Sequence, residues 1–243
     1  MTNNICIVLN VYKRRHYLID QINSVLSQTI QPTRIVILNN SQDIFRVKHP
    51  QIPLTIIDST ENLGVWSRFT IPLLFRHDFY CVFDDDTLPG ARWLENCLST
   101  YNNRRALLGT IGLRFLSRRY HEHIRYGWSN PVEEATTVDL VGHAWFFDYE
   151  MAKAFWSVKR LENSPYAGED IHFSYVLQME MGLETIVPPH PKEATDLWGA
   201  TQESSQKRGN DGFATSALPG AYARFQFALD YYLKSGFSLL NEK

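Results

Sequence analysis

The segment FYCVFDDD, residues 79–86, holds the pattern that decides the fold. Phe79 to Phe83 is an uninterrupted apolar run with the length of a buried strand, and Asp84, Asp85 and Asp86 follow it directly. A run that is apolar at successive positions is typical of a parallel strand covered on both faces. Polar residues placed directly after such a strand lie at the sheet edge where open α/β sheets bind ligands. The segment therefore predicts a layered α/β fold and also the position of a site.

Upstream of this segment, strand-like and helix-like patterns alternate along the chain. Apolar runs at Ile5 to Asn10, Ile35 to Leu38 and Leu54 to Ile57 are typical of strands. Between and after them, residues 18–26 and 65–75 carry apolar side chains at helical spacing. Such alternation predicts βαβ units whose strands pair in parallel through right-handed crossovers. The expected fold class is α/β, with a Rossmann-like, mainly parallel sheet flanked by helices.

Downstream of the segment, the pattern predicts further elements and two long connections. A loop that shapes a pocket is expected from Ser117 to Glu134, because this stretch is rich in Arg, His, Tyr and Trp without clean periodicity. A polar loop is expected from Pro188 to Pro219. The helix expected at 221–234 has broad apolar coverage, so it should dock on the body or on a partner. The other expected elements are a helix after Pro89 that carries Leu94, Leu98 and Tyr101, strands at 107–115, 138–141, 145–148 and 184–187, and helices at 149–156 and from Asp170 to Gly182.

Composition and charge exclude several classes of protein. The 243 residues, 44% of them hydrophobic, suffice for one sizeable core. A formal net charge of -2 gives no cationic field, so nucleic acid is not an expected partner. The apolar run Ile5 to Leu9 is too short for a signal peptide core or a membrane span. Cys6, Cys81 and Cys97 show no paired spacing, which favours a reducing compartment and a cytoplasmic location.

The acidic segment also predicts a chemistry. Three adjacent carboxylates repel one another, and a hard divalent cation relieves that repulsion while it bridges two phosphate oxygens. The alternative is a solvated turn that also caps the helix after Pro89.

Motifs on both sides of this segment form an ordered set. The set consists of Ile5 to Tyr12 followed by Lys13 and Arg14, the pair Asn39-Asn40, Asn62-Leu63-Gly64 with Arg68 downstream, Phe83 to Asp86, and Gly168-Glu169-Asp170 ahead of a helix. In this order and spacing the motifs resemble those of the GT-A glycosyltransferases, most closely of the family 2 enzymes. The segments Val11-Tyr12-Lys13-Arg14 and Glu169-Asp170-Ile171 are also similar to segments of the exostosin-type family. The resemblance extends over about residues 5 to 190.

The resemblance implies a GT-A type fold in which residues 1–190 form the catalytic domain. Residues 1–104 would be the nucleotide-sugar half of this domain, and residues 105–190 the acceptor half. Residues 191–243 would add a lid-like loop and a C-terminal helix.

The lid assignment depends on the composition of the loop. Trp198, Lys207 and Arg208 suit a segment that closes over a diphosphate and excludes water. An ordinary loop is the alternative.

The resemblance also implies a nucleotide-diphosphate sugar as donor, with a UDP-sugar favoured. Val11 and Tyr12, together with Asn40, would hold the base, and Arg14 lies beside them in the sequence. Backbone groups, an aromatic face and an amide suit this role. The alternative for Asn40 is a turn residue without a ligand.

Residues of the next motif would lie beside the nucleotide. Gly64 permits close backbone approach at a helix start, and Arg68 can reach phosphate or the acids with its planar fork. Asn62 would lie next to them. The alternative is that Asn62 caps the helix and Arg68 pairs with an acid on the surface of the protein.

The resemblance assigns Asp84 or Asp85 to the ribose and sugar, and Asp86 to a divalent metal ion. Oxygen ligands suit Mn²⁺ or Mg²⁺. His190 would be a further metal ligand, and the prolines on both sides of it restrict the backbone. A histidine without a functional role is the alternative.

The acceptor side is expected to contain the catalyst. Asp170 would be the base that takes the proton of the acceptor hydroxyl, with Glu169 beside it. Trp145 would stack on a sugar face. The alternatives are an N-cap role for Asp170 and a core position for Trp145.

These assignments predict inverting transfer of a sugar to a hydroxyl acceptor on a glycan or glycoconjugate. One alternative is a retaining transferase of the exostosin type, in which Asp170 faces the donor. A sugar nucleotidyltransferase is disfavoured because Val11 to His16 lacks a glycine-rich loop. A non-catalytic carbohydrate-binding protein is disfavoured by the intact acids.

Overall fold

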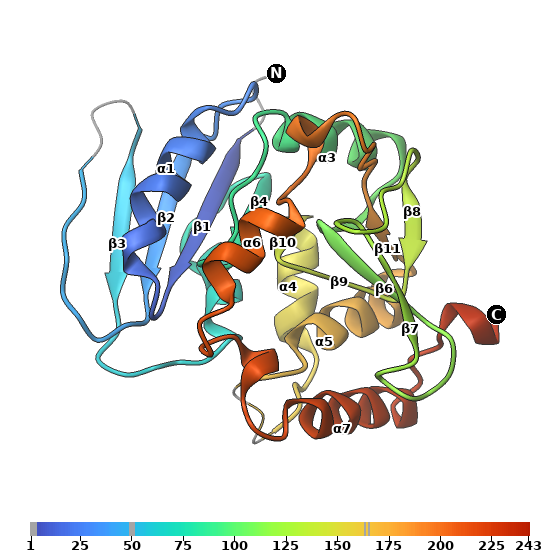
Figure 1. The fold of residues 1–243 in the computed structure, drawn as a ribbon. Helices are drawn as coiled ribbons and strands as arrows, with labels where there is room; N and C mark the ends of the chain where they lie inside the picture. The colour runs from blue at the N-terminus through green and yellow to red at the C-terminus, as the bar shows by residue number, and fades with distance from the viewer. Residues whose placement is uncertain (1–3, 49–51, 163, 165) are drawn as a thin grey trace.

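The computed structural model describes residues 4–48, 52–162, 164 and 166–243, and a large mixed sheet runs through it (Figure 1). Its strands are β1 (Ile5–Val11), β2 (Arg34–Asn39), β3 (Leu54–Asp58), β4 (Phe79–Phe83), β5 (Ala106–Leu108), β8 (Thr136–Val138), β10 (Ala144–Asp148) and β11 (Glu184–Val187). The spatial order is β3-β2-β1-β4-β10-β5-β11-β8. A smaller sheet has the order β7-β6-β9, with β6 (Ile111–Phe115), β7 (His123–Tyr126) and β9 (Leu140–Gly142).

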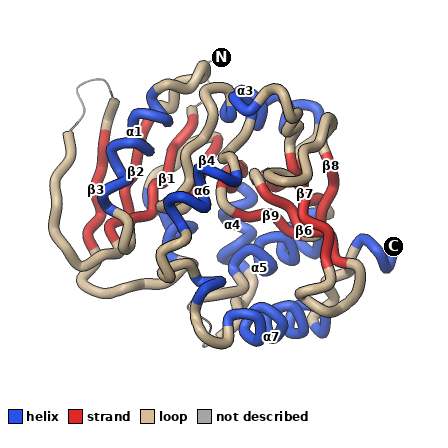
Figure 2. Tube along the Cα trace, viewed as in Figure 1, coloured by secondary structure: helices blue, strands red, loops and turns tan. Residues whose placement is uncertain are grey.

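Helices cover both faces of the large sheet (Figure 2). The α-helices are α1 (Leu18–Leu26), α2 (Ile71–Leu74), α3 (Trp93–Asn103), α4 (Tyr149–Ser157), α5 (Glu169–Val176), α6 (Gln202–Gly209) and α7 (Ala221–Lys234). Short 3-10 helices lie at Arg15–Tyr17, Ser67–Thr70, Thr195–Leu197, Thr215–Ala217 and Leu240–Glu242, and a π-helical turn at Leu177–Met181 continues α5. Among the described residues, no helix combines the length and the apolar character needed to cross a membrane.

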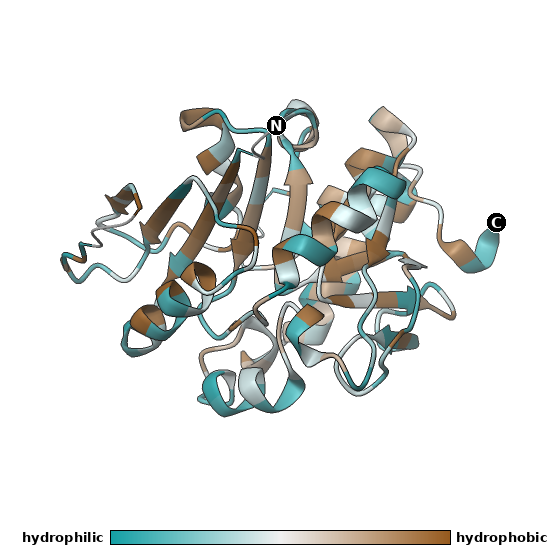
Figure 3. Ribbon diagram, turned by 90° about the horizontal axis from the view of Figure 1, so that it is seen from above, coloured by the Kyte–Doolittle hydropathy of each residue, from teal (hydrophilic) through white to brown (hydrophobic). Residues whose placement is uncertain are grey.

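The central strand β1 explains the layered core. Its pairs with β2 and β4 are both parallel. Alternate side chains of β1 enter two apolar clusters, because Ile7 packs in the layer of α1 and α3 whereas Val8 packs in the layer of α2 and α4. Burial on both faces requires apolar residues throughout the strand, and Figure 3 shows this as brown along the strands of the sheet. The predicted α/β class is confirmed.

The second half differs from the prediction in two respects. β10 is antiparallel to both β4 and β5, so the sheet is mixed. The strand predicted at 107–115 is two strands in different sheets, with a break at Gly109, where a Cβ atom would lie 2.5 Å from Cβ of Val141. The strand predicted at 138–141 is likewise divided between β8 and β9 at Asp139. Apolar runs do not reveal these breaks, because buried apolar residues lie on both sides of each break.

The C-terminal segment is more ordered than predicted. The polar loop expected from Pro188 to Pro219 contains α6 as well as two 3-10 turns. α7 has the bounds predicted for it and packs against α5. α6 has no apolar face, which is why hydrophobic periodicity did not predict it.

Asp139 fastens the C-terminus to the small sheet, so its loss should reduce stability. Its carboxylate is 4% exposed and accepts hydrogen bonds from the backbone N–H groups of Phe115 and Leu240, both at 2.7 Å. Asp139→Ala leaves these donors unpaired and should lower the free energy of unfolding by about 2–4 kcal/mol in urea denaturation. Asp43→Ala, a change at an exposed loop position, should alter it by less than about 0.5 kcal/mol. Equal stability of the two variants would contradict this role.

Candidate functional site

A cavity of about 890 Å³ lies at the carboxyl ends of β1, β2 and β4. Residues from both halves of the sheet, from the 117–134 segment and from the C-terminal segment line it. The predicted site residues that it brings together are Tyr12, Arg14, Asn40, Asn62, Gly64, Arg68, Asp84, Asp85, Asp86, Trp145, Glu169 and Asp170. Val11 and His190 are outside this lining.

The three aspartates after β4 are held by two buried arginines. The chain turns directly after the strand, with a hydrogen bond from N–H of Thr87 to the carbonyl of Asp84 at 3.1 Å. Asp84 forms an ion pair with Arg68, and Asp85 lies 2.5 Å from Nη1 of Arg14. Asp85 and Asp86 are only 8% and 7% exposed, so the alternative of a solvated turn is wrong. Burial raises the pKa of both carboxyls, and the positive charge of Arg14 opposes that shift.

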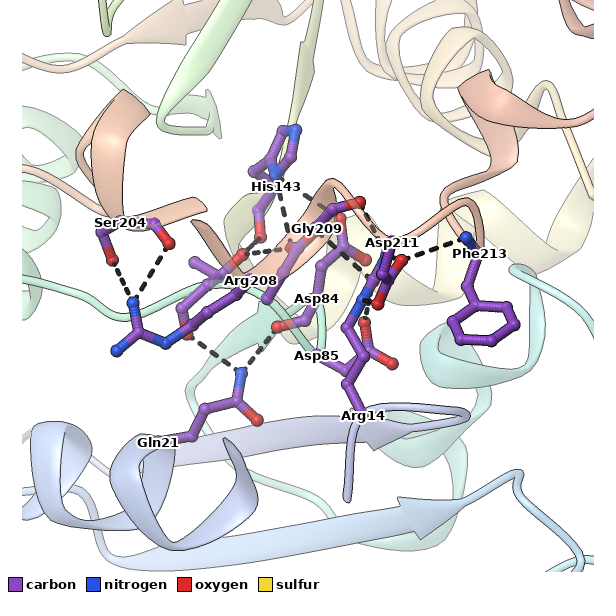
Figure 4. A network of polar contacts seen from close by, with 12 residues as sticks. Arg14, Gln21, Asp84, Asp85, His143, Ser204, Arg208, Gly209, Asp211 and Phe213 are labelled. Atoms are coloured by element: carbon purple, nitrogen blue, oxygen red, sulfur yellow. Dashed lines mark hydrogen bonds and ion pairs between the residues drawn. The ribbon is translucent and has the colours of Figure 1, made fainter. Parts of the chain in front are cut away.

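Arg14 links the acids to the C-terminal segment (Figure 4). Its Nε and Nη2 groups donate to the two carboxylate oxygens of Asp211, each at 2.8 Å, and Nη2 also donates to the carbonyl of Gly209 at 3.2 Å. Gly209 lies so close to the acids that an added Cβ would be 2.4 Å from Oδ2 of Asp86. The segment that was predicted as a lid is therefore docked over the acidic cluster. Neither Gly209 nor Asp211 stands in a pattern that marks it in the sequence.

Arg68 joins the acids to the acceptor side. It is 4% exposed, its Nη2 group donates to Oε1 of Glu169 at 2.7 Å, and its guanidinium lies 4.4 Å from the centre of the Trp145 ring. The alternative of a surface ion pair is therefore wrong. Trp145 is 2% exposed and donates its indole N–H to the carbonyl of Val141 at 2.9 Å. The prediction that Trp145 stacks on a sugar is thus corrected, because its ring is buried and contacts Arg68.

Two asparagines shape the floor of the cavity near β1 and β2. Asn40 accepts from N–H of Leu63 at 2.7 Å and donates to Oδ1 of Asn62 at 3.0 Å. Asn62 in turn accepts from N–H of Gly64 at 2.9 Å, and Gly64 has φ 74°, a left-handed conformation that favours glycine. Asn62 does not cap the following helical segment, which begins after Trp66. The amides hold this loop and line the cavity at the same time.

Val11 supports the cavity wall through its backbone carbonyl. Its side chain is 1% exposed, and its carbonyl accepts from N–H of Asn40 at 2.7 Å. It therefore positions Asn40, and its side chain does not face the cavity.

Glu169 and Asp170 lie at the start of α5. The cap position belongs to Gly168, which has φ 93°, so the alternative of Asp170 as N-cap is wrong. Burial, together with the charge of Asp170, raises the pKa of Glu169 to about 7. Burial raises the pKa of Asp170 to about 6, against a hydrogen bond at 2.8 Å from N–H of Ile171. The pair supplies a carboxyl group that titrates near neutral pH.

His143 completes a group of possible metal ligands. One atom each from Asp84, Asp86 and His143 lie within 4.8 Å of one another. Nδ1 of His143 is 3.8 Å from Oδ1 of Asp86 and 3.9 Å from Oδ2 of Asp84. This nitrogen is buried and has no hydrogen-bond partner among the described residues. Its orientation and the carboxylate oxygens beside it fit a divalent cation such as Mn²⁺.

The predicted metal role of His190 is corrected. Its side chain is fully buried and packs against the rings of Trp93 and Trp198. Nδ1 lies 2.6 Å from the carbonyl of Pro188 and must donate to it, and Nε2 lies 2.9 Å from the hydroxyl of Thr110. Burial lowers the pKa of His190 to about 4, so the ring is neutral and both nitrogens are engaged. His143, to which the sequence pattern assigned no role, lies beside the acids instead.

His143 and Trp128 share an uncommon backbone conformation. Their φ angles are 70° and 47°, and their rings lie 4.8 Å apart in the cavity wall. Left-handed conformations of non-glycine residues cost on the order of 1–3 kcal/mol and are concentrated at functional sites. Trp128 belongs to the segment predicted to shape a pocket.

Comparison with known proteins identifies the fold. No protein-family model and no curated protein sequence matches the chain. The structure of S. aureus TarS matches with a TM-score of 0.52 and 13% sequence identity, over 76% of this chain and 35% of TarS. A structure of S. aureus TarS 1-349 in complex with UDP gives a TM-score of 0.53 and 14% identity, over 76% of this chain and 58% of that chain.

These matches confirm the predicted GT-A type architecture, an α/β fold with a mixed, mainly parallel sheet flanked by helices. At such low identity they show the fold alone. The chain covers well under two thirds of either TarS chain.

The ion pair between Arg14 and Asp211 should hold the C-terminal segment on the acids. Asp211→Ala removes both hydrogen bonds to the guanidinium fork, so α6 should detach more often. Trypsin cleavage after Lys207 and Arg208, followed by mass spectrometry, should become several-fold faster. Glu203→Ala changes an exposed acid on the same helix and should leave the rate unchanged. Equal cleavage of both variants would show that the pair does not secure the segment.

Proposed function

We propose that this protein is a nucleotide-sugar glycosyltransferase that moves a sugar from a UDP-sugar to a hydroxyl acceptor and uses a divalent metal ion. One observation carries the proposal. A single cavity contains both the group Asp84, Asp86 and His143, which suits a cation, and Asp170, a carboxyl whose pKa is raised to about 6. The GT-A type fold and the presence of UDP in one TarS structure support the same activity.

The ends of β1 and β2 suit the nucleoside. Tyr12 offers an aromatic face, Asn40 an amide and Gly64 a backbone without a side chain, and all three line the cavity. Arg14 suits the diphosphate, because its planar fork already binds the two oxygens of a carboxylate, that of Asp211. Phosphate oxygens match the same fork. Asp211 would leave this position when a diphosphate binds.

Mn²⁺ or Mg²⁺ held by Asp84, Asp86 and His143 would neutralise the charge that develops on the leaving diphosphate. The two arginines contact the carboxylate oxygens that His143 does not face. Arg68 binds Oδ1 of Asp84, and Arg14 contacts Oδ2 of Asp86. Such partners orient carboxylate ligands.

Asp170 would act as the base that takes the proton of the acceptor hydroxyl. A carboxyl group with a pKa near 6 is mostly ionised at neutral pH and still has a useful affinity for a proton. Arg68 fixes the neighbouring Glu169, which leaves Asp170 as the acid without an arginine partner in this pair. Direct in-line displacement would invert the configuration at the sugar, and the anomeric configuration of the product distinguishes this from a retaining reaction.

Removal of a metal ligand should weaken metal-dependent nucleotide binding strongly. In His143→Ala and Asp86→Ala, titration calorimetry with UDP and Mn²⁺ should show an affinity at least about tenfold lower than in the wild type. The matched control is His190→Gln, whose side chain lies outside the cavity lining; its UDP affinity should stay within about twofold. An unchanged affinity in His143→Ala would remove this residue from the metal site.

Asp170→Asn should lower turnover by about a hundredfold or more, because the amide cannot take a proton. In the wild type, protonation of Asp170 removes the base, so turnover should fall as the pH drops through about 6. Because Glu169 has a pKa of about 7, the lower limb of the pH profile reports the pair. The measurement is initial rate against pH with saturating UDP-sugar and Mn²⁺. A variant with turnover within a few-fold of the wild type would show that the base lies elsewhere, and an unchanged UDP affinity is its control.

A further inference from the structure

Aromatic rings from two distant segments form one wall of the cavity. Tyr120 precedes β7, whereas Tyr222 and Phe225 lie one turn apart on α7. The ring centres of Tyr120 and Phe225 are 5.0 Å apart, and those of Tyr222 and Phe225 are 6.4 Å apart. All three residues line the cavity that contains Asp170. Tyr120, Tyr222 and Phe225 are called the aromatic wall below.

Hydrogen bonds and packing hold the aromatic wall in place. Gln226 of α7 accepts from N–H of Tyr120 at 2.7 Å and donates to the carbonyl of Arg118 at 2.9 Å. Further along the same face of α7, Ala228, Leu229 and Tyr232 are fully buried. The wall is therefore preorganised, although the side chain of Tyr222 is 65% exposed. Preorganisation lowers the entropic cost of binding a ligand.

The aromatic wall lies close to the proposed base. Burial raises the pKa of Tyr120 well above its usual value, and the negative charges of Asp170 and Glu169 add to the shift. α7 packs against α5, which begins at Glu169, and a Cβ atom added at Gly168 would lie 2.9 Å from Cβ of Ala228 on α7. A molecule on the wall would thus lie within reach of Asp170.

We propose that the aromatic wall is the acceptor subsite and that it binds the C–H face of a pyranose ring, bringing a hydroxyl group of that acceptor to Asp170. This inference rests on the proposed function. Pyranoses with equatorial substituents, such as β-linked glucose or N-acetylglucosamine units, have apolar ring faces and hydroxyls at their edges. An aromatic ring can cover such a face without leaving a hydroxyl unpaired.

Polar groups beside the aromatic wall suit a sugar better than a purely apolar ligand. His123 has its ring centre 6.0 Å from that of Tyr120, and Arg125 follows it on β7; both line the cavity. They supply donors for hydroxyl groups at the ring edge. Apolar surface with a few placed polar groups is the usual composition of a specific small-molecule site.

The test measures sugar binding and UDP binding on the same proteins. Cellotriose and chitotriose are the probes, and saturation-transfer NMR with UDP and Mn²⁺ present reports their contact with the protein. Tyr222→Ala removes an exposed ring, so the fold should be retained. Phe227→Ala is the matched control, because Phe227 lies on the same helix, is 60% exposed and does not line the cavity. UDP affinity is measured by calorimetry for each protein.

The proposal predicts that the wild type binds at least one trisaccharide through its ring C–H protons. Tyr222→Ala should weaken this binding about tenfold, Phe227→Ala should not change it, and UDP affinity should be equal in all three. If the wild type binds UDP but neither trisaccharide, the subsite is overturned and the proposed function stands. The same holds if Tyr222→Ala and Phe227→Ala lose trisaccharide binding equally. Absence of UDP binding by the wild type would instead contradict the proposed function, and a trisaccharide signal that Tyr222→Ala removes would still support the aromatic wall.

Discussion

The concentration of carboxylates at the carboxyl end of β4 is the constraint on which the rest of the cavity depends. Asp85 and Asp86 are buried, and Asp84 lies beside them. Buried charges of one sign are costly unless opposite charges and hydrogen bonds surround them. Arg14 and Arg68 meet this need, and the positions of other elements follow from the further bonds that these arginines make.

Each arginine connects the acids to a different part of the chain. Arg68 reaches Glu169 at the start of α5, and Arg14 reaches Asp211 beyond the end of α6. Carboxylates still outnumber arginines in this network. Burial raises the pKa of four of them, Asp85, Asp86, Glu169 and Asp170. A divalent cation beside Asp84, Asp86 and His143 would relieve that excess of negative charge. Burial is also the main reason why the pKa of Asp170, the proposed base, is raised to about 6.

The sheet gives this network a rigid frame. β1 and β4 are buried on both faces and pair in parallel, so their carboxyl ends present Arg14 and the acids side by side. The antiparallel strand β10 then brings its N-terminal end, next to His143, to the same edge. If β10 ran parallel to β4, its N-terminal end would lie at the opposite edge of the sheet. The mixed topology therefore places His143 beside Asp84 and Asp86.

The sequence by itself determined the elements whose pattern is local. β1, β4, β11, α1 and α7 follow from apolar runs and helical spacing, and the acidic site follows from polar residues placed directly after a buried strand. Most of the predicted site residues line the cavity because the carboxyl ends of neighbouring parallel strands meet at one edge. Only the tertiary structure decided that His143 and not His190 joins the acids, that the Trp145 ring packs on Arg68, and that Asp211 pairs with Arg14 across 197 residues. These contacts depend on strand order and on packing between distant segments, which leave no periodic signal in the chain.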